Sequence, residues 1–186
     1  MTLSSPVAAQ DFQKGYAAYQ AGDYATALQE WTPLAEAGDA SAQFILGVMY
    51  FTGQGVPQDD AEAVKWYRLA ADQGNANAQS FLGDMYESGK GVPQDDAEAV
   101  KWYRLAADQG LANAQALLGI MYVQGNGVLK DNVMAHMWFN IASASGNDKA
   151  GEWRDKRADL MTPAAIEKAQ AMARECMSSG YTKCGE

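Results

Sequence analysis

Residues that could carry out chemistry are few in this sequence, and their spacing fits no catalytic motif. The chain has one histidine, His136, so a catalytic or metal site built from several histidines is excluded. No cysteine or carboxylate stands at ligand spacing on the helix face expected for His136, so we interpret it as a packed histidine. The serines lack the flanking residues of the S-x-x-K and G-x-S-x-G nucleophile motifs. We therefore expect no catalytic residue, no metal site and no cofactor.

Two recurring motifs could be mistaken for ligand sites. The loops at residues 53–55 and 89–91 read G-x-G, but they lack the third glycine of a dinucleotide fingerprint and the G-K-[ST] of a P-loop. The aspartate pairs at 59–60 and 95–96 follow these loops and would repel phosphate. Because each pair stands at the same place in two copies of a repeat, we interpret the pairs as helix caps.

The cysteines Cys176 and Cys184 could form a disulfide bond. Two cysteines are too few for a disulfide scaffold, but they could close the C-terminal tail in an oxidising compartment if the chain turns back at Gly180. The alternative is a pair of free thiols. The choice depends on whether the protein is exported.

Residues 1–10 bear on export, because they are small and uncharged and 7–9 read Val-Ala-Ala. This sequence fits the small-x-small pattern of a signal-peptidase site. We interpret residues 1–10 as a disordered remnant of an export signal or an artificial leader, the alternative being an ordinary disordered N-terminus. A periplasmic or secreted location is therefore expected, with the cytoplasm as the alternative.

The composition excludes several classes of partner. Of 186 residues, 48% are hydrophobic and 20% charged, which is typical of a chain that folds. There are 14 Lys and Arg against 23 Asp and Glu, a net charge of −9, so we expect no binding to nucleic acid or anionic lipid. No apolar run approaches the roughly 20 residues that a transmembrane helix needs, so we expect no membrane insertion.

An internal repeat of 36 residues determines the expected fold. Residues 55–74 read GVPQDDAEAVKWYRLAADQG, and residues 91–110 read the same twenty letters. Other residues recur at the same step, namely Trp66, Trp102 and Trp138; Tyr50, Tyr86 and Tyr122; and Gly47, Gly83 and Gly119. A single helix pair cannot bury its apolar face, whereas stacked copies can. We therefore predict an all-α fold, a right-handed α/α solenoid of stacked helix-turn-helix repeats with a C-terminal capping helix.

Each copy is expected to fold as two helices, here called helix A and helix B. In the first copy helix A includes residues 42–50, and Gly47 in its middle predicts close approach by a neighbouring helix. Helix B should begin after Asp59 as its N-cap and end at Gly74. The residues predicted to face inward from helix B are Ala63, Trp66, Ala70 and Ala71.

These recurring residues closely resemble the SEL-one-like repeat family, a relative of the tetratricopeptide repeats. The family pattern resembles A-x-x-x-L-G-x-x-Y-x-x-G-x-G-V-x-x-D-x-x-x-A-x-x-W-x-x-x-A-A-x-x-G. The first copy fills it with Ala42, Leu46, Gly47, Tyr50, Gly53, Gly55, Val56, Asp59, Ala63, Trp66, Ala70, Ala71 and Gly74. The second copy matches from Ala78 to Gly110 and the third from Ala114 to Gly146, with Ser143 where the others have alanine.

The resemblance divides the chain into successive units. Residues 11–38 look like a shortened, tetratricopeptide-like repeat, and residues 39–74, 75–110 and 111–146 are three SEL-one-like repeats. Residues 147–186 form capping helices and a tail. Thr162 and Pro163 predict the start of the last helix, roughly 163–179.

Positions that differ between the copies are the candidate ligand-binding residues. Three variable columns lie at i, i+4 and i+7 of helix A and form one face, separate from the fixed stripe. The columns are Phe12, Phe44, Ser80 and Ala116; Tyr16, Val48, Asp84 and Ile120; and Tyr19, Phe51, Glu87 and Val123. Tetratricopeptide repeats use equivalent positions to line a concave groove for peptides. The resemblance therefore implies a peptide with apolar anchors and a basic residue opposite Asp84 and Glu87. The alternative is that Phe12, Tyr16 and Tyr19 are covered by the N-terminal segment.

The resemblance implies a non-catalytic scaffold or adaptor for a protein or peptide partner, in a bacterial envelope. One alternative is an enzyme that binds or hydrolyses β-lactams, as described for cysteine-rich relatives. Those relatives carry a cysteine pair in each repeat, whereas the repeats here have none. Another alternative is a structural component of a secretion or polysaccharide-export complex.

Overall fold

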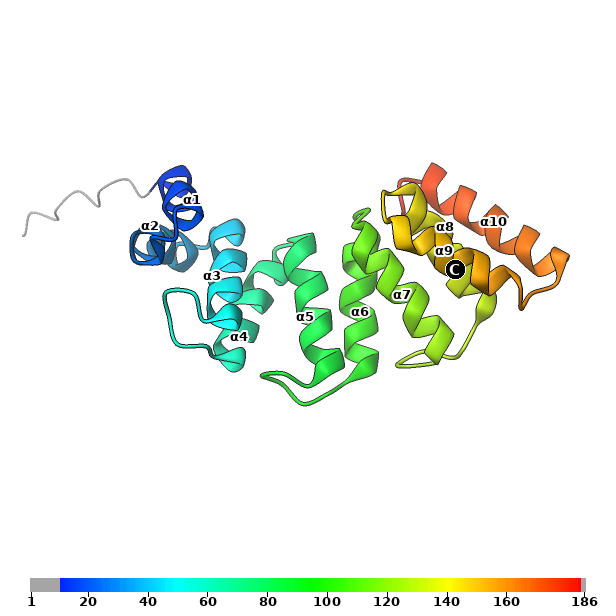
Figure 1. Ribbon diagram of the computed structural model, residues 1–186, viewed down its shortest axis with the longest axis horizontal. Coiled ribbons are helices and arrows are strands. Elements are labelled where there is room, and N and C mark those ends of the chain that lie inside the picture. The colour runs from blue at the N-terminus through cyan, green and yellow to red at the C-terminus, as the bar shows by residue number, and fades with distance from the viewer. Residues whose placement is uncertain (1–10, 185–186) are drawn as a thin grey trace, which may run out of the picture. The chain divides into compact units, whose positions relative to one another are not determined.

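The computed structural model describes residues 11–184, and this part of the chain is entirely helical (Figure 1). The helices are α1 (Phe12–Gln20), α2 (Tyr24–Glu36), α3 (Ala40–Thr52), α4 (Asp60–Asp72), α5 (Ala76–Ser88), α6 (Asp96–Ala107), α7 (Ala112–Gln124), α8 (Asn132–Ala144), α9 (Asp148–Ala158) and α10 (Pro163–Ser178). The predicted all-α repeat fold is confirmed. Residues 1–10, interpreted above as the remnant of an export signal, lie outside the described residues.

The described residues form two compact units, 11–75 and 76–184. The first unit contains α1 to α4, and the second contains α5 to α10. Within each unit, helix A of a repeat packs against its own helix B, as α3 does with α4, α5 with α6 and α7 with α8. None of the helices in residues 11–184 has the length and hydrophobicity needed to span a lipid bilayer.

Helix B of each repeat begins at a capping aspartate, as predicted. Asp59 accepts a hydrogen bond from the backbone N–H of Glu62, and Asp95 accepts one from that of Glu98, both at 2.9 Å. Asp131 accepts one from the backbone N–H of Val133 at 2.7 Å in the third repeat. These bonds satisfy N–H groups that have no partner inside the helix.

The two identical sequence segments share several contacts within their own repeats. Lys65 pairs with Glu62 in α4, and Lys101 pairs with Glu98 in α6, both at 2.7 Å. The side-chain amides of Gln73 and Gln109 each donate to a glutamine of the preceding helix A, at 2.7 Å in both repeats. The same twenty residues thus fold in the same way at two places in the chain.

The mid-helix glycines leave room for aromatic rings, and the predicted close approach is confirmed. A Cβ atom built on Gly47 would lie 2.5 Å from Cδ1 of Tyr67, far inside normal contact distance. The other pairs have the same arrangement and are Gly15 with Trp31, Gly83 with Tyr103, and Gly119 with Phe139. Each glycine therefore allows helix B to pack closely on helix A of its own repeat.

Trp66 packs against the core of the first unit, as predicted, but the most deeply buried aromatic residue of helix B stands one position later, at Tyr67. Tyr67 and Tyr103 are fully buried, whereas Trp66 and Trp102 are only half-buried; Trp138 alone of its column is fully buried. The residue that faces the glycine of helix A must lie four positions after the buried alanine at the start of helix B. That position is 67 after Ala63, and Trp66 lies at the edge of the first unit's core.

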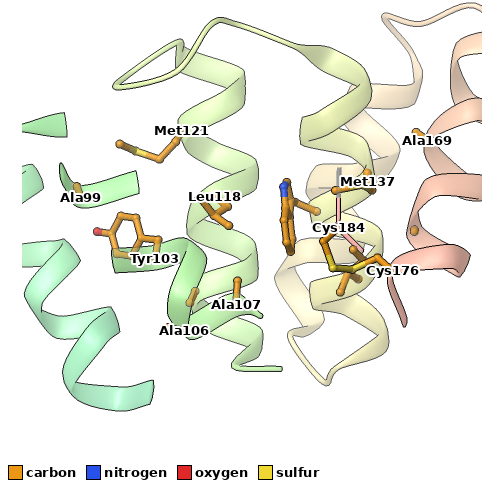
Figure 2. Close-up of a cluster of buried hydrophobic side chains, with 14 residues drawn as sticks. Ala99, Tyr103, Ala106, Ala107, Leu118, Met121, Met137, Ala169, Cys176 and Cys184 are labelled. Atoms are coloured by element: carbon orange, nitrogen blue, oxygen red, sulfur yellow. A yellow bond between two sulfur atoms is a disulfide. The ribbon is translucent and has the colours of Figure 1, made fainter. Parts of the chain in front are cut away.

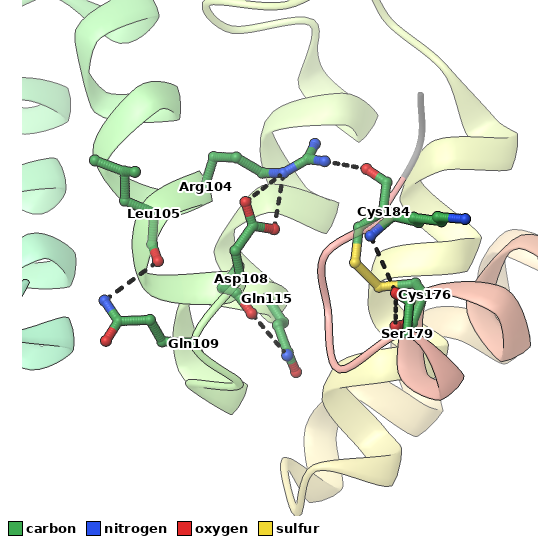
Figure 3. A network of polar contacts seen from close by, with 10 residues as sticks. Arg104, Leu105, Asp108, Gln109, Gln115, Cys176, Ser179 and Cys184 are labelled. Atoms are coloured by element: carbon green, nitrogen blue, oxygen red, sulfur yellow. Dashed lines mark hydrogen bonds and ion pairs between the residues drawn. A yellow bond between two sulfur atoms is a disulfide. The ribbon is translucent and has the colours of Figure 1, made fainter.

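The end of the chain covers the last repeat. Helix α10 packs against α8, and Cys176 and Cys184 form a disulfide bond within the core that also contains Tyr103 and Trp138 (Figure 2). The Arg104 side chain donates to the carbonyl oxygen of Cys184 (Figure 3). The Arg104 guanidinium also lies over the Trp138 ring, 5.0 Å from its centroid. The disulfide-closed tail is therefore tied to both the second and the third repeat.

Candidate ligand-binding surface

Four of the predicted groove residues line a small hollow in the first unit. Tyr16, Tyr19, Phe44 and Val48 surround a volume of about 190 Å³, with Trp31 and Ile45 completing the wall. Tyr16 is 47% exposed, so its ring is open to contact. The hydroxyl of Tyr19 donates to Oε1 of Gln54, and burial raises the Tyr19 pKa. This hollow is almost entirely aromatic and aliphatic.

Phe12 and Phe51 lie outside that hollow. The ring of Phe12 packs on Trp31, with 5.8 Å between their centroids, and Phe51 is half-buried near the end of α3. The alternative that the N-terminal segment covers Phe12, Tyr16 and Tyr19 involves residues 1–10, which are outside the described part of the chain.

A larger hollow in the second unit collects predicted residues from two neighbouring repeats. Ser80 and Asp84 on α5 and Ala116 and Ile120 on α7 line a volume of about 330 Å³. Ser80 and Ala116 are buried in its floor, whereas Asp84 is exposed. The remaining wall consists of Phe81, Asn113, Leu117, Asn147 and Trp153. The structure thus brings variable positions of two helices together around one cavity.

Asp84 and Glu87 meet at the hydroxyl of Tyr103. The Tyr103 oxygen lies 2.6 Å from Oδ1 of Asp84 and 2.6 Å from Oε2 of Glu87. Partial desolvation by the surrounding protein raises the pKa of Asp84 although the residue is exposed, and the nearby Glu87 raises it further, while the bond from Tyr103 opposes both. Burial and the two carboxylates also raise the pKa of Tyr103, which keeps the phenol protonated. One hydroxyl proton therefore serves two acceptors.

The acid pair is confined to the second repeat. The equivalent residues are Val48 and Phe51 in the first repeat and Ile120 and Val123 in the third. In the third repeat Phe139 replaces the tyrosine, so the hydroxyl is also missing there. The second repeat is thus the one place where this face carries a polar, acidic group.

A second hollow in the same unit contains residues that the sequence interpretation missed. Ile120 and Val123 line it together with Phe139, Trp153, Lys156 and Arg157, around a volume of about 330 Å³. Trp153 packs on Phe139, with 5.7 Å between the ring centroids. A further step of 36 residues from Ile120 leads to Lys156, so the repeat period itself contained the signal for this residue.

His136 lies in the interior of α8, where it is 2% exposed. Burial lowers its pKa, and the Arg154 charge lowers it further while Asp155 raises it. Its Nδ1 has no hydrogen-bond partner among residues 11–184. The same part of the chain holds no cluster of three or more His, Cys, Asp or Glu side chains suited to a metal ion. His136 therefore occupies a packed position.

Stacked helix pairs, glycine–aromatic packing and a variable helix A face define an α-helical repeat protein of the tetratricopeptide-like superfamily. The Sel1 repeat family model matches residues 40–75, 76–111 and 112–147, which together exceed half of the chain. The chain belongs to the Sel1 repeat family. Its predicted repeats begin one residue earlier than these matches, and the division of the whole chain stays a prediction.

Solved structures of related proteins have the same fold. A Sel1 repeat protein from Oxalobacter formigenes is 30% identical, with a TM-score of 0.78 over 91% of this chain and 78% of that one. A protective antigen of uropathogenic Escherichia coli with an SLR fold is 42% identical, with a TM-score of 0.72 over 75% of this chain and 31% of that one. This chain thus spans about a third of the length of the E. coli protein.

A more distant structure shares the fold alone. Cysteine-rich protein B of Helicobacter pylori is 24% identical, with a TM-score of 0.55 over 69% of this chain and 92% of that one. No curated protein matches the sequence. Sel1 repeat proteins generally mediate protein–protein interactions and are mostly non-catalytic scaffolds.

Proposed function

We propose that this protein is a non-catalytic scaffold that binds a segment of a partner protein on the variable face of its A helices. The observation that carries the proposal is the hollow lined by Ser80, Asp84, Ala116 and Ile120. These positions differ between repeats, whereas the neighbouring positions that are the same in every repeat pack in the core. A concave surface whose chemistry varies along a constant scaffold is suited to recognising one particular segment.

The acid pair defines the polar part of the ligand. Asp84 and Glu87 share one hydroxyl proton from Tyr103, so one carboxylate is short of a hydrogen-bond donor. A Lys or Arg side chain of the partner supplies both the donor and the compensating charge. The apolar side chains around the same hollow accept an aliphatic or aromatic residue next to that basic one.

The hollow of the first unit is a separate candidate site with an apolar lining. Its walls, formed by Tyr16, Tyr19, Phe44 and Val48, are suited to a further apolar anchor. The proposed ligand-binding residues of the first unit also include Phe12 and Phe51, and those of the second unit also include Glu87 and Val123, as the sequence pattern predicts. The segment bound by the second unit is therefore apolar with one basic residue, and the hollow of the first unit accepts an apolar residue.

An extracytoplasmic location, in the periplasm or outside a bacterial cell, is part of the proposal. It is supported by the Cys176–Cys184 disulfide, since such bonds persist in oxidising compartments. A β-lactam-binding or hydrolysing activity is not favoured. The cysteine pairs of those relatives lie in the repeats, whereas here both cysteines lie in or after α10.

The test is a selection of peptides from a random phage-displayed library on the purified protein. We expect the enriched peptides to combine apolar residues with one Lys or Arg. The double variant Asp84→Asn with Glu87→Gln should bind these peptides with an affinity at least about tenfold lower than that of the wild type. The matched control, Asp96→Asn with Glu98→Gln, makes the same charge change on α6, outside the hollow. Equal binding by both variants would remove the proposal.

A further inference from the structure

Three of the four cations on α9 have no ion-pair partner among residues 11–184. Helix α9 contains Lys149, Arg154, Lys156 and Arg157, and Arg154 pairs with Asp155 at 2.7 Å. Lys156 and Arg157 form no ion pair with any residue from 11 to 184. This is notable in a chain with a net charge of −9, where acidic groups are abundant.

Two of these cations, Lys156 and Arg157, border an apolar cavity. The other walls of the hollow are Ile120, Val123, Phe139 and Trp153. Phe139 is buried at 2% exposure, while Trp153 is half-buried and closes one side. A site of this kind holds an apolar side chain in its interior and an anion at its cationic edge.

The guanidinium of Arg157 is held in position from one side. Its Nη1 donates to Oδ1 of Asn132 on α8, at 3.3 Å. Its Nε is buried and has no hydrogen-bond partner among the described residues. A planar guanidinium held at Nη1 is fixed in orientation, which favours binding of a carboxylate at its other terminal nitrogen, Nη2.

The cationic hollow continues into the acidic one. Ile120 and Trp153 belong to the walls of both cavities. Asp84 lies in the wall of one cavity, and Lys156 and Arg157 lie in the wall of the other. A single bound segment that crosses this shared wall therefore meets negative charge on one side and positive charge on the other.

We infer that the hollow formed by Ile120, Val123, Phe139, Trp153, Lys156 and Arg157 binds an apolar residue and a neighbouring Glu or Asp of the partner segment. The inference rests on the proposed function and adds the acidic half of the ligand. A side-chain carboxylate is the chosen anion because the Arg157 side chain is half-buried and its Nε is buried. A flexible side chain reaches such a group more easily than the backbone carboxylate of a chain end.

The probes are acetylated and amidated peptides that contain one Lys, one Phe and one Glu. In this series the Phe-to-Glu spacing runs from adjacent to four residues apart. Each peptide has a partner with Gln in place of Glu, and binding is measured by fluorescence anisotropy. We expect the best Glu peptide to bind about tenfold more tightly than its Gln partner.

Protein variants test which cations are responsible. Lys156→Ala and Arg157→Gln should each weaken binding of the Glu peptide several-fold and leave the affinity for the Gln peptide unchanged. Lys149→Ala removes the same charge from the same helix, away from the hollow, and should change neither. If Arg157→Gln perturbs folding, the charge reversal Lys156→Glu keeps the test decisive, because it should favour a peptide with Lys in place of Glu.

The outcomes distinguish this inference from the proposed function. If peptides bind through Asp84 and Glu87 with no preference for Glu over Gln, the inference is wrong and the proposed function stands. Tighter binding by a peptide with a free C-terminus and no Glu would assign the cations to a chain end and overturn the inference. If no peptide of the series binds the wild-type protein, the inference also fails.

Discussion

Gly83 lies so close to the ring of Tyr103 that a methyl group at position 83 would be 2.6 Å from Cδ1 of the tyrosine. The close packing that this glycine permits also fixes the position of the Tyr103 hydroxyl relative to α5. That hydroxyl contacts Asp84, the residue next to the glycine, and Glu87, one turn further along α5. A position chosen for close packing thus also organises the acidic part of the proposed binding surface.

Gly83→Ala is predicted to destabilise the protein. The added methyl would overlap the Tyr103 ring, at a cost of about 1–3 kcal/mol, which exceeds the gain of up to about 1 kcal/mol from better helix propensity. Urea unfolding monitored by circular dichroism measures the difference. Gly151→Ala is the control, because its methyl would meet only Ser143, and it should be neutral or slightly stabilising.

Asp84→Asn is predicted to be at least as stable as the wild type at pH 7. The folded-state pKa of Asp84 is raised above its ordinary value of 3.8, chiefly by partial desolvation of its carboxylate. The protonated carboxyl of Asp84 therefore contributes fully to stability below pH 3.8. This contribution is lost as the pH rises through the folded-state pKa. The amide cannot ionise and can still accept from Tyr103. Thermal melts at pH 7 and pH 4 should show an advantage that shrinks on acidification, and a less stable variant at pH 7 would contradict this.

His136 is predicted to make the fold less stable below about pH 6.5. Its folded-state pKa is lowered, chiefly by burial, so its contribution to stability is present above the unfolded value of 6.5. This contribution is lost as the pH falls from there through the folded-state pKa, with a limiting slope of about 1.4 kcal/mol per pH unit.

The measurement for His136 is the urea midpoint between pH 7.5 and 5. His136→Gln removes the ionisation and should flatten the profile, even if it lowers stability at every pH. Since the chain has a single histidine, no other side chain with an unperturbed pKa titrates in this range. An unchanged slope in the variant would assign the effect to other groups.

Reduction of the Cys176–Cys184 bond is predicted to lower stability by about 2–3 kcal/mol, the amount expected from closing a loop of this size. The bond joins residues separated by eight positions and fixes the tail that Arg104 contacts. Mass spectrometry after alkylation without reductant measures its formation, and melts with and without reductant measure its effect. Labelling of both cysteines in the unreduced protein would show that the bond is absent.

The repeat period was enough to predict most of the helices. The fixed columns and the aspartate caps placed α3 to α8, and Thr162 with Pro163 placed the start of α10. The sequence could not show which of two adjacent aromatic residues, Trp66 or Tyr67, is buried, because both recur in the copies. That choice depends on the rotation of helix B about its own axis, which is set by contact with Gly47.

The binding surface was predictable only in part. Variable positions such as Asp84 and Ile120 could be read from the alignment of the copies, and the structure places them around one cavity. Trp153 and Arg157 were missed because α9 has lost most of the repeat pattern. Their position depends on how α9 packs against α8, which no single column of residues encodes.

The shared folding of residues 55–74 and 91–110 has a consequence for how this protein can change over generations. Both stretches begin and end their helices with the same contacts. A recombination event that joined one stretch to the other would delete residues 55–90, which is one full period, and would leave the remaining repeats in register. Such an event would remove Asp84 and Glu87 together with the helix that bears them. The array could therefore shorten and alter its ligand preference in one genetic step.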